Sequence, residues 1–187
     1  MKYILASKSP RRKELLGEII PDFEIVVKKV DESLPREIHP REGVEILAVR
    51  KGAAVAEESP DCVVISSDTL VELGGIPLGK PKDEEEAVAM LTSLSGKAHN
   101  VHTGVAVHYC GKVFSGVATT AVYFREMTPA EISAYVATGD PMDKAGSYGI
   151  QSGGGKFVEK IEGDYDTVVG LSLRLVKDLL DEIYLFI

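Results

Sequence analysis

The sequence predicts an α/β protein, because apolar segments of strand length alternate with helices that begin at capping residues. Residues 2–6 have the composition of a short strand and are followed by a helix with Ser9 as its N-cap. Residues 62–65 form a continuous apolar run, which is typical of a strand covered on both faces. Asp83 and Thr128 are each followed three positions later by a glutamate, and this capping-box spacing predicts two further helices.

Length and composition restrict the class of protein. A chain of 187 residues can form one sizeable core, or two lobes that share a sheet, so we expect a single domain over residues 1–187. Hydrophobic residues at 44% and charged residues at 27% are ordinary for a soluble globular protein. No apolar run approaches the roughly 18 residues of a membrane span, and the apolar N-terminal segment is too short for a signal-peptide core. We therefore expect a cytoplasmic protein that does not contact membranes.

The charge of the chain favours a small anionic ligand over a polyanionic partner. The formal net charge of −8 argues against broad binding to nucleic acid or to anionic membranes. The basic stretch 8–13 is a local exception to this charge. Cys62 and Cys110 show neither metal-ligand spacing nor a disulfide framework, and we interpret both as free thiols.

The remaining elements follow from apolar periodicity, turn residues and caps. The expected strands are 23–27, 70–73 with 76–78 as a hairpin around Gly74 and Gly75, 98–109, 112–125 and 157–161, and the expected helices are 40–59, 83–95, 128–139 and 167–184. Residues 28–40 form a polar connection, and residues 140–155 form a loop rich in small residues. His99 and His102 are three apart on a strand and therefore point to opposite faces, which excludes them as a metal-binding pair.

Arg11 and Arg12 occupy the first turn of a helix, where the macrodipole disfavours cations by about 0.3–1 kcal/mol each. A bound phosphate would reverse this penalty, because free backbone N–H groups, the hydroxyls of Ser7 and Ser9 and two forked guanidinium groups would all donate to it. The alternative is a solvated basic turn. Without a ligand, removal of either arginine relieves the dipole interaction, so we expect neither alanine variant to melt below the native protein.

Three further charged residues lie where a ligand site is expected. Asp68 follows a buried strand, and open α/β sheets bind ligands at the carboxyl ends of strands; the alternative is an ordinary turn or N-cap aspartate. Lys51 lies inside the apolar stripe of its helix, where a lysine either extends past its neighbours to solvent or directs its ammonium into a cleft. Lys80 stands between a glycine and a proline on a short, stiffened loop. Gln151 lies in the small-residue loop and can read a nucleobase edge, because it both donates and accepts.

Five stretches together resemble the Maf family of nucleoside triphosphate pyrophosphatases, from residue 5 to about residue 173. The matching motifs are ASKSPRR at 6–12, SDT at 67–69, GKP at 79–81, DKAGSYGIQ at 143–151 and VVGL at 168–171. The two arginines, Thr69 and the YGIQ run look like the branch of the family that acts on dTTP and UTP. Ser67 and Ser152 depart from the pattern, since a small apolar residue and a glycine are expected there.

The resemblance implies a fold, a ligand and roles for the residues. The fold would be a mixed α/β fold like that of the inosine triphosphate pyrophosphatases, with a curved central sheet flanked by helices and a cleft between two lobes. The protein would be a homodimer that uses a divalent cation, Mg²⁺ or Mn²⁺, and binds a pyrimidine nucleoside triphosphate. The implied roles are a general base (Asp68), metal ligands (Asp68 and Glu32), phosphate-binding groups (Ser7, Arg11, Arg12, Lys51 and Lys80) and base-contacting groups (Thr69 and Gln151), with Lys80 and Glu32 assisting catalysis.

The function implied is hydrolysis of dTTP and UTP to the monophosphate and pyrophosphate. An alternative is a nucleotide-binding regulator of cell division and septum formation with little turnover. The combination of Asp68, Glu32 and Lys80 favours the enzyme, because a protein that only binds its ligand needs no general base. A third possibility is an enzyme that releases orthophosphate.

Overall fold

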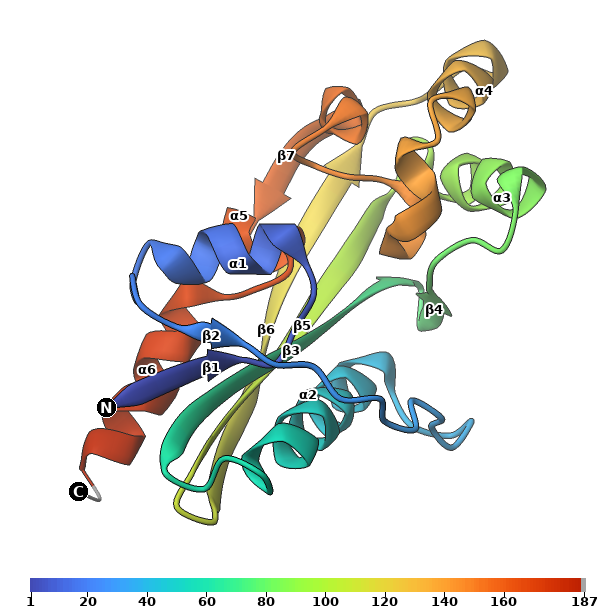
Figure 1. Ribbon diagram of the computed structural model, residues 1–187. Coiled ribbons are helices and arrows are strands. Elements are labelled where there is room, and N and C mark those ends of the chain that lie inside the picture. The colour runs from blue at the N-terminus through green and yellow to red at the C-terminus, as the bar shows by residue number, and fades with distance from the viewer. Residues whose placement is uncertain (186–187) are drawn as a thin grey trace. The chain divides into compact units, whose positions relative to one another are not determined.

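The computed structural model describes residues 1–185 and contains one mixed sheet of seven strands (Figure 1). The strand order is β2-β1-β3-β5-β6-β7, with β4 paired to β3. The strands are β1 (Lys2–Leu5), β2 (Glu24–Ile25), β3 (Cys62–Leu73), β4 (Ile76–Leu78), β5 (Ala98–Tyr109), β6 (Lys112–Phe124) and β7 (Val158–Glu162). β1 pairs in parallel with β2 and β3, whereas β4 and β7 pair antiparallel with β3 and β6. The predicted mixed α/β class is confirmed.

Six α-helices accompany the sheet within the described residues. They are α1 (Pro10–Gly17), α2 (Pro40–Ala56), α3 (Glu84–Leu94), α4 (Pro129–Ala137), α5 (Tyr165–Val169) and α6 (Leu173–Tyr184). Three short 3₁₀ turns, at Asp140–Asp143, Ala145–Ser147 and Gly153–Phe157, lie in the small-residue loop. No helix in the described chain has both the length and the apolar character needed to cross a bilayer.

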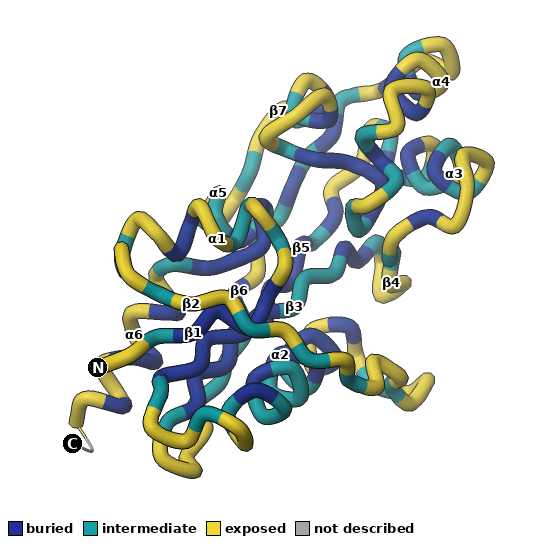
Figure 2. Tube along the Cα trace, in the orientation of Figure 1, coloured by how far each residue is buried: buried dark blue, intermediate teal, exposed yellow. Residues whose placement is uncertain are grey.

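The chain divides into two compact units, and each has its own packing. The first unit comprises Met1–Thr69, Thr103–Ala118 and the C-terminal segment from Gly170, and the second comprises Leu70–His102 and Thr119–Val169. The long strands β3, β5 and β6 contribute residues to both units. Along β3, Figure 2 shows buried stretches next to an intermediate one; residues 63–67 are buried, and Ile65, Ser66 and Ser67 among them are fully buried.

In the first unit, helix α2 packs closely against the strands because two glycines leave no room for a side chain. A Cβ at Gly104 would lie 2.3 Å from the carbonyl oxygen of Val44, and a Cβ at Gly52 would lie 2.5 Å from the Ser66 hydroxyl. The buried Ser66 hydroxyl donates to the carbonyl oxygen of Ala48 at 2.7 Å. The helix is therefore fixed at a short distance from β3 and β5, and this fixes where its side chains reach.

The second unit is built on an aromatic and aliphatic core. Thirteen buried residues form it: Val71, Ala87, Leu91, Leu94, Val101, Val122, Phe124, Met127, Ile132, Tyr135, Val136, Tyr148 and Phe157. His99 packs edge-on against Phe124 and Tyr148, with ring centroids 4.9 and 5.4 Å apart, and its Nε2 lies 2.8 Å from the Tyr148 hydroxyl. His102 has different partners, Glu72 and Thr119.

The predicted end of a strand before Asp68 is wrong, because β3 continues without a break from Cys62 to Leu73. The polar residues at 66–69 indicated a strand end to sequence reasoning. In the structure, their hydroxyls bond to backbone carbonyls inside the protein, and the strand continues past Ile65, where its pairing with β1 ends. The hairpin to β4 is confirmed, and both Gly74 and Gly75 have positive φ.

The prediction that residues 167–184 are mostly helical is confirmed, with one interruption. α5 ends at Val169, Gly170 has a φ of 130°, and Ser172 caps a new helix. The capping box at Asp83 forms only in part, since Glu86 accepts from the backbone N–H of Lys82, outside the expected pair. The other capping box, between Thr128 and Glu131, is confirmed.

The buried histidine of the second unit predicts a pH-dependent stability. Burial lowers the pKa of His99 to about 4, against an ordinary value of 6.5. Between these values the unfolded chain binds a proton that the folded chain does not, so stability is full above pH 6.5 and falls as the pH drops towards 4. A difference of this size corresponds to about 3 kcal/mol of unfolding free energy. The loss should be smaller in His99→Asn than in the native protein when urea unfolding is measured between pH 7.5 and 5; part of it remains because burial also lowers the pKa of His108. A His99 ring that titrates near 6.5 by NMR would contradict the argument.

Candidate active site

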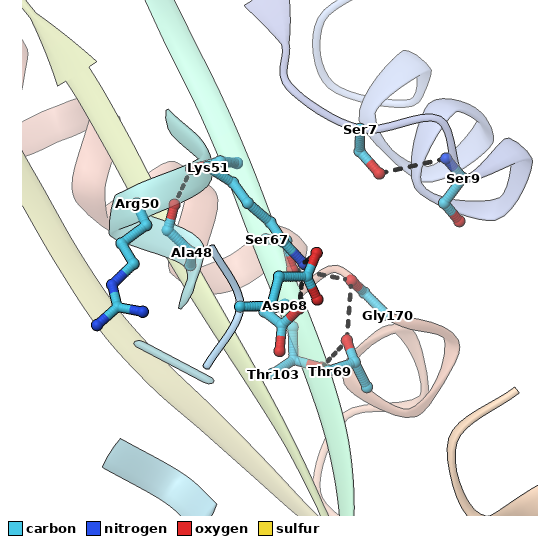
Figure 3. A network of polar contacts seen from close by, with 12 residues as sticks. Ser7, Ser9, Ala48, Arg50, Lys51, Ser67, Asp68, Thr69, Thr103 and Gly170 are labelled. Atoms are coloured by element: carbon cyan, nitrogen blue, oxygen red, sulfur yellow. Dashed lines mark hydrogen bonds and ion pairs between the residues drawn. The ribbon is translucent and has the colours of Figure 1, made fainter. Parts of the chain in front are cut away.

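The start of helix α1 is organised by two serine hydroxyls. Ser9 has extended backbone angles and its hydroxyl accepts from the backbone N–H of Arg12 at 3.4 Å, so the predicted N-cap is confirmed. Ser7 is buried, and its hydroxyl accepts from the backbone N–H of Ser9 at 3.2 Å (Figure 3). Pro10 follows at the first helical position. These bonds fix the turn that carries the two arginines.

Arg12 is half-buried among hydrogen-bond acceptors of the first unit. Its Nε donates to the carbonyl oxygen of Gly170 at 2.7 Å, its Nη2 to the Thr69 hydroxyl at 3.1 Å and its Nη1 to the Ser7 hydroxyl at 3.4 Å. Three of its five N–H groups are used in this way. Within residues 1–185 the other two, one on each terminal nitrogen, have no hydrogen-bond partner, so the guanidinium can still donate to an anion.

The carbonyl oxygen of Gly170 is the shared acceptor of this region. Besides Arg12, it accepts from the buried hydroxyl of Ser67 at 3.0 Å and from that of Thr69 at 3.4 Å (Figure 3). The Thr69 hydroxyl also lies 3.0 Å from that of Thr103 on β5. Ser67 and Thr69 are two apart on one strand, so their side chains lie on the same face and Asp68 between them points to the other face.

On that other face, Asp68 meets the lysine of helix α2. The Lys51 ammonium donates to Asp68 Oδ1 at 2.6 Å (Figure 3). It also lies 3.2 Å from Glu32 Oε1, so one cation bridges two carboxylates. The side chains of Lys51 and Asp68 are 20% and 16% exposed, whereas that of Glu32 is 61% exposed. Lys51 therefore does not extend past its neighbours to solvent, and Asp68, which lies inside β3, is neither a turn nor an N-cap aspartate. The roles of both residues in a ligand site stay predictions.

The loop that carries Glu32 is held by its neighbours. Asp31 accepts from both the backbone N–H and the hydroxyl of Ser33 at 2.8 Å, which forms a local turn. Arg50 on α2 donates to the carbonyl oxygens of Asp31 and Ser33, at 3.1 and 2.7 Å. Because these two carbonyls flank Glu32, Arg50 fixes the backbone of an exposed loop from which the Glu32 side chain reaches Lys51.

Five charges act on one another in this site. Burial lowers the pKa of Arg12, the Arg11 cation lowers it further, and the carboxylates of Asp68 and Glu32 oppose both effects. With Lys51, three cations therefore face two carboxylates, which leaves a local excess of one positive charge. We define the charge cluster by these five residues: Arg11, Arg12, Lys51, Asp68 and Glu32. Its excess of one positive charge suits an anionic ligand.

Lys80 and Gln151 belong to the second unit and are placed within it. Both side chains are exposed. The carbonyl oxygen of Gly79 accepts from the backbone N–H of Gly146 at 3.1 Å, which ties the Lys80 loop to the small-residue loop. A Cβ at Gly146 would lie 2.8 Å from the Val71 side chain, so only glycine fits at this junction. The other seven predicted site residues, Ser7, Arg11, Glu32, Arg12, Lys51, Asp68 and Thr69, belong to the first unit.

The donor set fits a divalent cation that also binds the substrate. Within the described residues there is no group of three or more His, Cys, Asp or Glu side chains that would enclose a metal. Mg²⁺ is usually held by one or two carboxylates together with substrate phosphates and water, and it needs no cage made only of protein ligands. Asp68 and Glu32 supply that number of carboxylates, and Asp68 Oδ2 has no hydrogen-bond partner in the described chain.

Sequence comparison assigns the chain to a family. The family described as "Maf-like protein" matches residues 2–183. The chain belongs to the Maf family. Among curated Maf relatives, a protein of Moorella thermoacetica named "dTTP/UTP pyrophosphatase" is 50% identical over 181 residues, which cover 96% of this chain and 93% of that protein. A protein of Bacillus cytotoxicus with the same name is 49% identical over 179 residues, with 95% and 94% covered.

The fold of this Maf protein is shared with a solved structure of low sequence identity. "The structure of the Staphylococcus aureus Ham1 protein" matches with a TM-score of 0.55 and 15% identity, over 100% of this chain and 97% of that chain. At this identity the likeness concerns the fold alone. It agrees with the mixed, helix-flanked sheet that the motifs implied.

Sequence reasoning missed three residues that build the site. Gly170 was part of a matching motif but received no role, because every residue has a backbone carbonyl and the residue type does not indicate which carbonyl is used as an acceptor. Ser67 was noted as a departure from the family pattern, and its hydroxyl binds that same carbonyl. Arg50, which holds the Glu32 loop, stands next to Lys51, and an arginine on an exposed helix surface gives no signal of its own.

The contacts of Arg12 change the expected effect of removing it. The helix dipole alone predicts that removing Arg12 raises the free energy of unfolding by about 0.3–1 kcal/mol. Loss of a hydrogen bond made by a charged group lowers it by about 1.5–3 kcal/mol, which is the larger effect. Arg12→Ala without nucleotide should therefore lower the free energy of unfolding by roughly that amount, and Arg12→Lys should also lose stability because an ammonium lacks the forked geometry.

The matched control is Lys13→Ala, which removes an exposed cation from the same helix and should stay within about 0.5 kcal/mol of the native protein. Urea unfolding of the four proteins makes the comparison. An Arg12→Ala protein as stable as the native one would mean that these three hydrogen bonds do not hold the turn.

Proposed function

We propose that this protein hydrolyses dTTP and UTP to the monophosphate and pyrophosphate. The observation that carries the proposal is the Asp68–Lys51–Glu32 arrangement beside the arginines of α1, in a Maf protein about 50% identical to relatives named for this activity. Asp68 is held by the Lys51 ammonium inside a cluster that has an excess of positive charge. This arrangement suits activation of a water beside a bound polyphosphate.

Asp68 acts on the attacking water in this proposal. The water oxygen forms a bond to phosphorus, the bridging P–O bond between the α- and β-phosphoryl groups breaks, and the water's proton passes to the Asp68 carboxylate. Lys51 holds Oδ1, so Oδ2 is the oxygen available to the water. Asp68 keeps its position because Ser67 and Thr69 on either side of it are bonded to the Gly170 carbonyl.

The cationic residues bind the charge of the substrate. Arg11 and Arg12, with the backbone N–H groups at the start of α1, bind phosphoryl oxygens, and Lys51 lies close enough to the reacting carboxylate to do the same. The alternative role of Asp68 is that its Oδ2, together with Glu32, would hold a divalent cation, which would neutralise further phosphate charge and lower the pKa of a bound water. In the second unit, Lys80 is assigned to phosphate and Gln151 to the base, and both roles stay predictions, as do the homodimer and the cytoplasmic location.

The regulatory alternative requires binding with little turnover. The structure adds an argument for the enzyme, because Asp68 is 16% exposed and lies on a strand fixed from both sides. A binding protein gains little from a carboxylate near phosphate, since like charges repel. Release of orthophosphate is separated from release of pyrophosphate by product analysis.

The decisive experiment is a panel of nucleoside triphosphates incubated with Mg²⁺ or Mn²⁺, with pyrophosphate and orthophosphate measured separately. We expect dTTP and UTP to give the highest kcat/KM and pyrophosphate to be the product. Equal or faster cleavage of ATP or GTP would contradict the substrate assignment, orthophosphate as the product would contradict the bond assignment, and tight binding without turnover would favour the regulator.

Asp68→Asn should lose most of its turnover on dTTP while it keeps the fold. The substitution removes a base but preserves size, and general bases contribute about 10²–10⁴-fold to rate. The control is Asp61→Asn, the same change at an exposed position just before β3, which should leave kcat unchanged. Near-native kcat in Asp68→Asn, with both variants folded by circular dichroism, would remove Asp68 from the mechanism.

A further inference from the structure

A network of polar side chains in the second unit surrounds the segment that carries Gln151. We propose that Asp140 is a positioning residue: its carboxylate holds residues 149–152 in the conformation that presents Gln151 to the pyrimidine base, and so sets the selectivity for that base. The inference rests on the proposed function and deepens it. It assigns a role to a residue outside the cluster that acts on the phosphates.

Asp140 accepts from three side chains. The Tyr135 hydroxyl and the Ser152 hydroxyl each donate to Asp140 Oδ2 at 2.6 Å, and the Lys144 ammonium donates to Oδ1 at 3.0 Å and to the carbonyl oxygen of Asp140 at 2.7 Å. Ser152 is the residue directly after Gln151. The carboxylate therefore binds the base-contacting segment at its C-terminal end.

The same network binds the other end of the segment. The backbone N–H of Gly149 donates to the Tyr135 hydroxyl at 3.1 Å, and the Ser152 hydroxyl lies 3.3 Å from the carbonyl oxygen of Gly149. Tyr135 thus accepts from Gly149 and donates to Asp140 through one oxygen. Because Tyr135 is only 2% exposed and packs in the core, the segment is anchored to a rigid element, helix α4.

The network is partly shielded from solvent, although Ser152 itself is exposed. The side chains of Lys144 and Asp140 are 13% and 24% exposed. Burial raises the pKa of Asp140, but the hydrogen bonds from Ser152, Tyr135 and Lys144 outweigh it, and the net direction is downward. The carboxylate therefore stays ionised near neutral pH and accepts all of these donors at once, which an amide in its place cannot do.

Close packing restricts the backbone conformation of this segment. A Cβ at Gly149 would lie 2.4 Å from the Ser152 hydroxyl, and a Cβ at Gly155 would lie 2.4 Å from the carbonyl oxygen of Ile150. Just before the segment, Ser147 is a buried non-glycine residue with a φ of 62°, a conformation that costs about 1–3 kcal/mol and persists only where neighbours enforce it. The surrounding packing thus holds the backbone of Ser147 in a left-handed conformation that a serine alone does not favour.

Gln151 itself depends on this support. Its side chain is exposed, and it has no hydrogen bond or ion pair within residues 1–185. A long, mobile side chain reads a base edge only if its backbone is fixed, because hydrogen bonds lose strength steeply with distance and angle. The Ser152 hydroxyl, which stands where the family pattern has glycine, adds one bond to that fixation.

The test compares Asp140→Asn, Ser152→Ala and Ser152→Thr with the native protein, using kcat and KM on dTTP, UTP, dCTP and ATP. Asp140→Asn should raise KM for dTTP about tenfold or more and reduce the preference for dTTP over dCTP by a similar factor, with kcat changed less than about threefold. Ser152→Ala should do the same to a smaller extent. Ser152→Thr keeps the hydroxyl and should restore native KM and selectivity.

Glu131→Gln is the matched control. Glu131 lies in the same unit, accepts from Arg125 at 2.8 Å and caps α4, and the bonds from Arg125 and Thr128 lower its pKa to about 2. Its neutralisation should lower stability without a change in KM or selectivity. If Glu131→Gln and Asp140→Asn raise KM alike, the effect is one of general stability and the inference is wrong.

A second readout does not depend on activity. Hydrogen exchange of the backbone amides of residues 149–152 should accelerate about tenfold or more in Asp140→Asn and less in Ser152→Ala, and stay native in Glu131→Gln. Unchanged exchange in both Asp140→Asn and Ser152→Ala would show that the network does not hold the segment. A native protein that does not cleave dTTP or UTP would overturn the proposed function, whereas native cleavage with unchanged KM and selectivity in the variants would overturn this inference alone.

Discussion

The carbonyl oxygen of Gly170 is the constraint on which the arrangement of the first unit depends. It lies in the break between α5 and α6, and it accepts from Arg12 of α1 and from Ser67 and Thr69 of β3. One backbone atom thus connects the arginine turn to the strand that carries Asp68. Because the two strand residues on either side of Asp68 are fixed on one face, Asp68 has to project from the other face, towards Lys51.

The second requirement is that α2 lies close enough to β3 for the Lys51 side chain to reach Asp68. Gly104 and Gly52 remove the side chains that would hold the helix away, and Ser66 bonds to the Ala48 carbonyl. The energetic cost of placing Lys51 and Asp68 where they are only partly solvated is offset by their hydrogen-bonded pairing, and Glu32 adds a second carboxylate from the side of solvent. The close packing of the α2 backbone on the strands therefore determines the 2.6 Å contact between Lys51 and Asp68.

The sequence predicted what is encoded locally. Ser9 as N-cap, the proline at the start of α1, the capping box at Thr128 and the turn at Gly74 and Gly75 each follow from a few adjacent residues. The candidate cluster was also found, since a lysine in an apolar stripe and an aspartate after a buried strand are chemically unusual.

What the sequence did not predict depends on partners distant in the chain. The residues at 66–69 indicated a strand end, because isolated serines and threonines favour turns; inside the protein the hydroxyls of Ser66 and Ser67 bind the carbonyls of Ala48 and Gly170, so the strand continues. Arg12 was predicted either to bind a phosphate or to lie in a solvated basic turn. Its bond to Gly170 spans 158 positions, and no pattern of nearby residues reveals that a guanidinium also holds the fold.

The distribution of charge explains how an acidic protein can bind a polyphosphate. The net charge of −8 repels a nucleoside triphosphate at long range, but salt screens exposed charges beyond about 8 Å at physiological ionic strength. Within that distance of the site, Arg11, Arg12 and Lys51 exceed the two carboxylates. Burial strengthens these local interactions because fewer water dipoles oppose them, as the influence of Asp68 and Glu32 on the pKa of Arg12 illustrates. A small anion that reaches the start of α1 therefore meets a local excess of positive charge, although the chain as a whole is acidic.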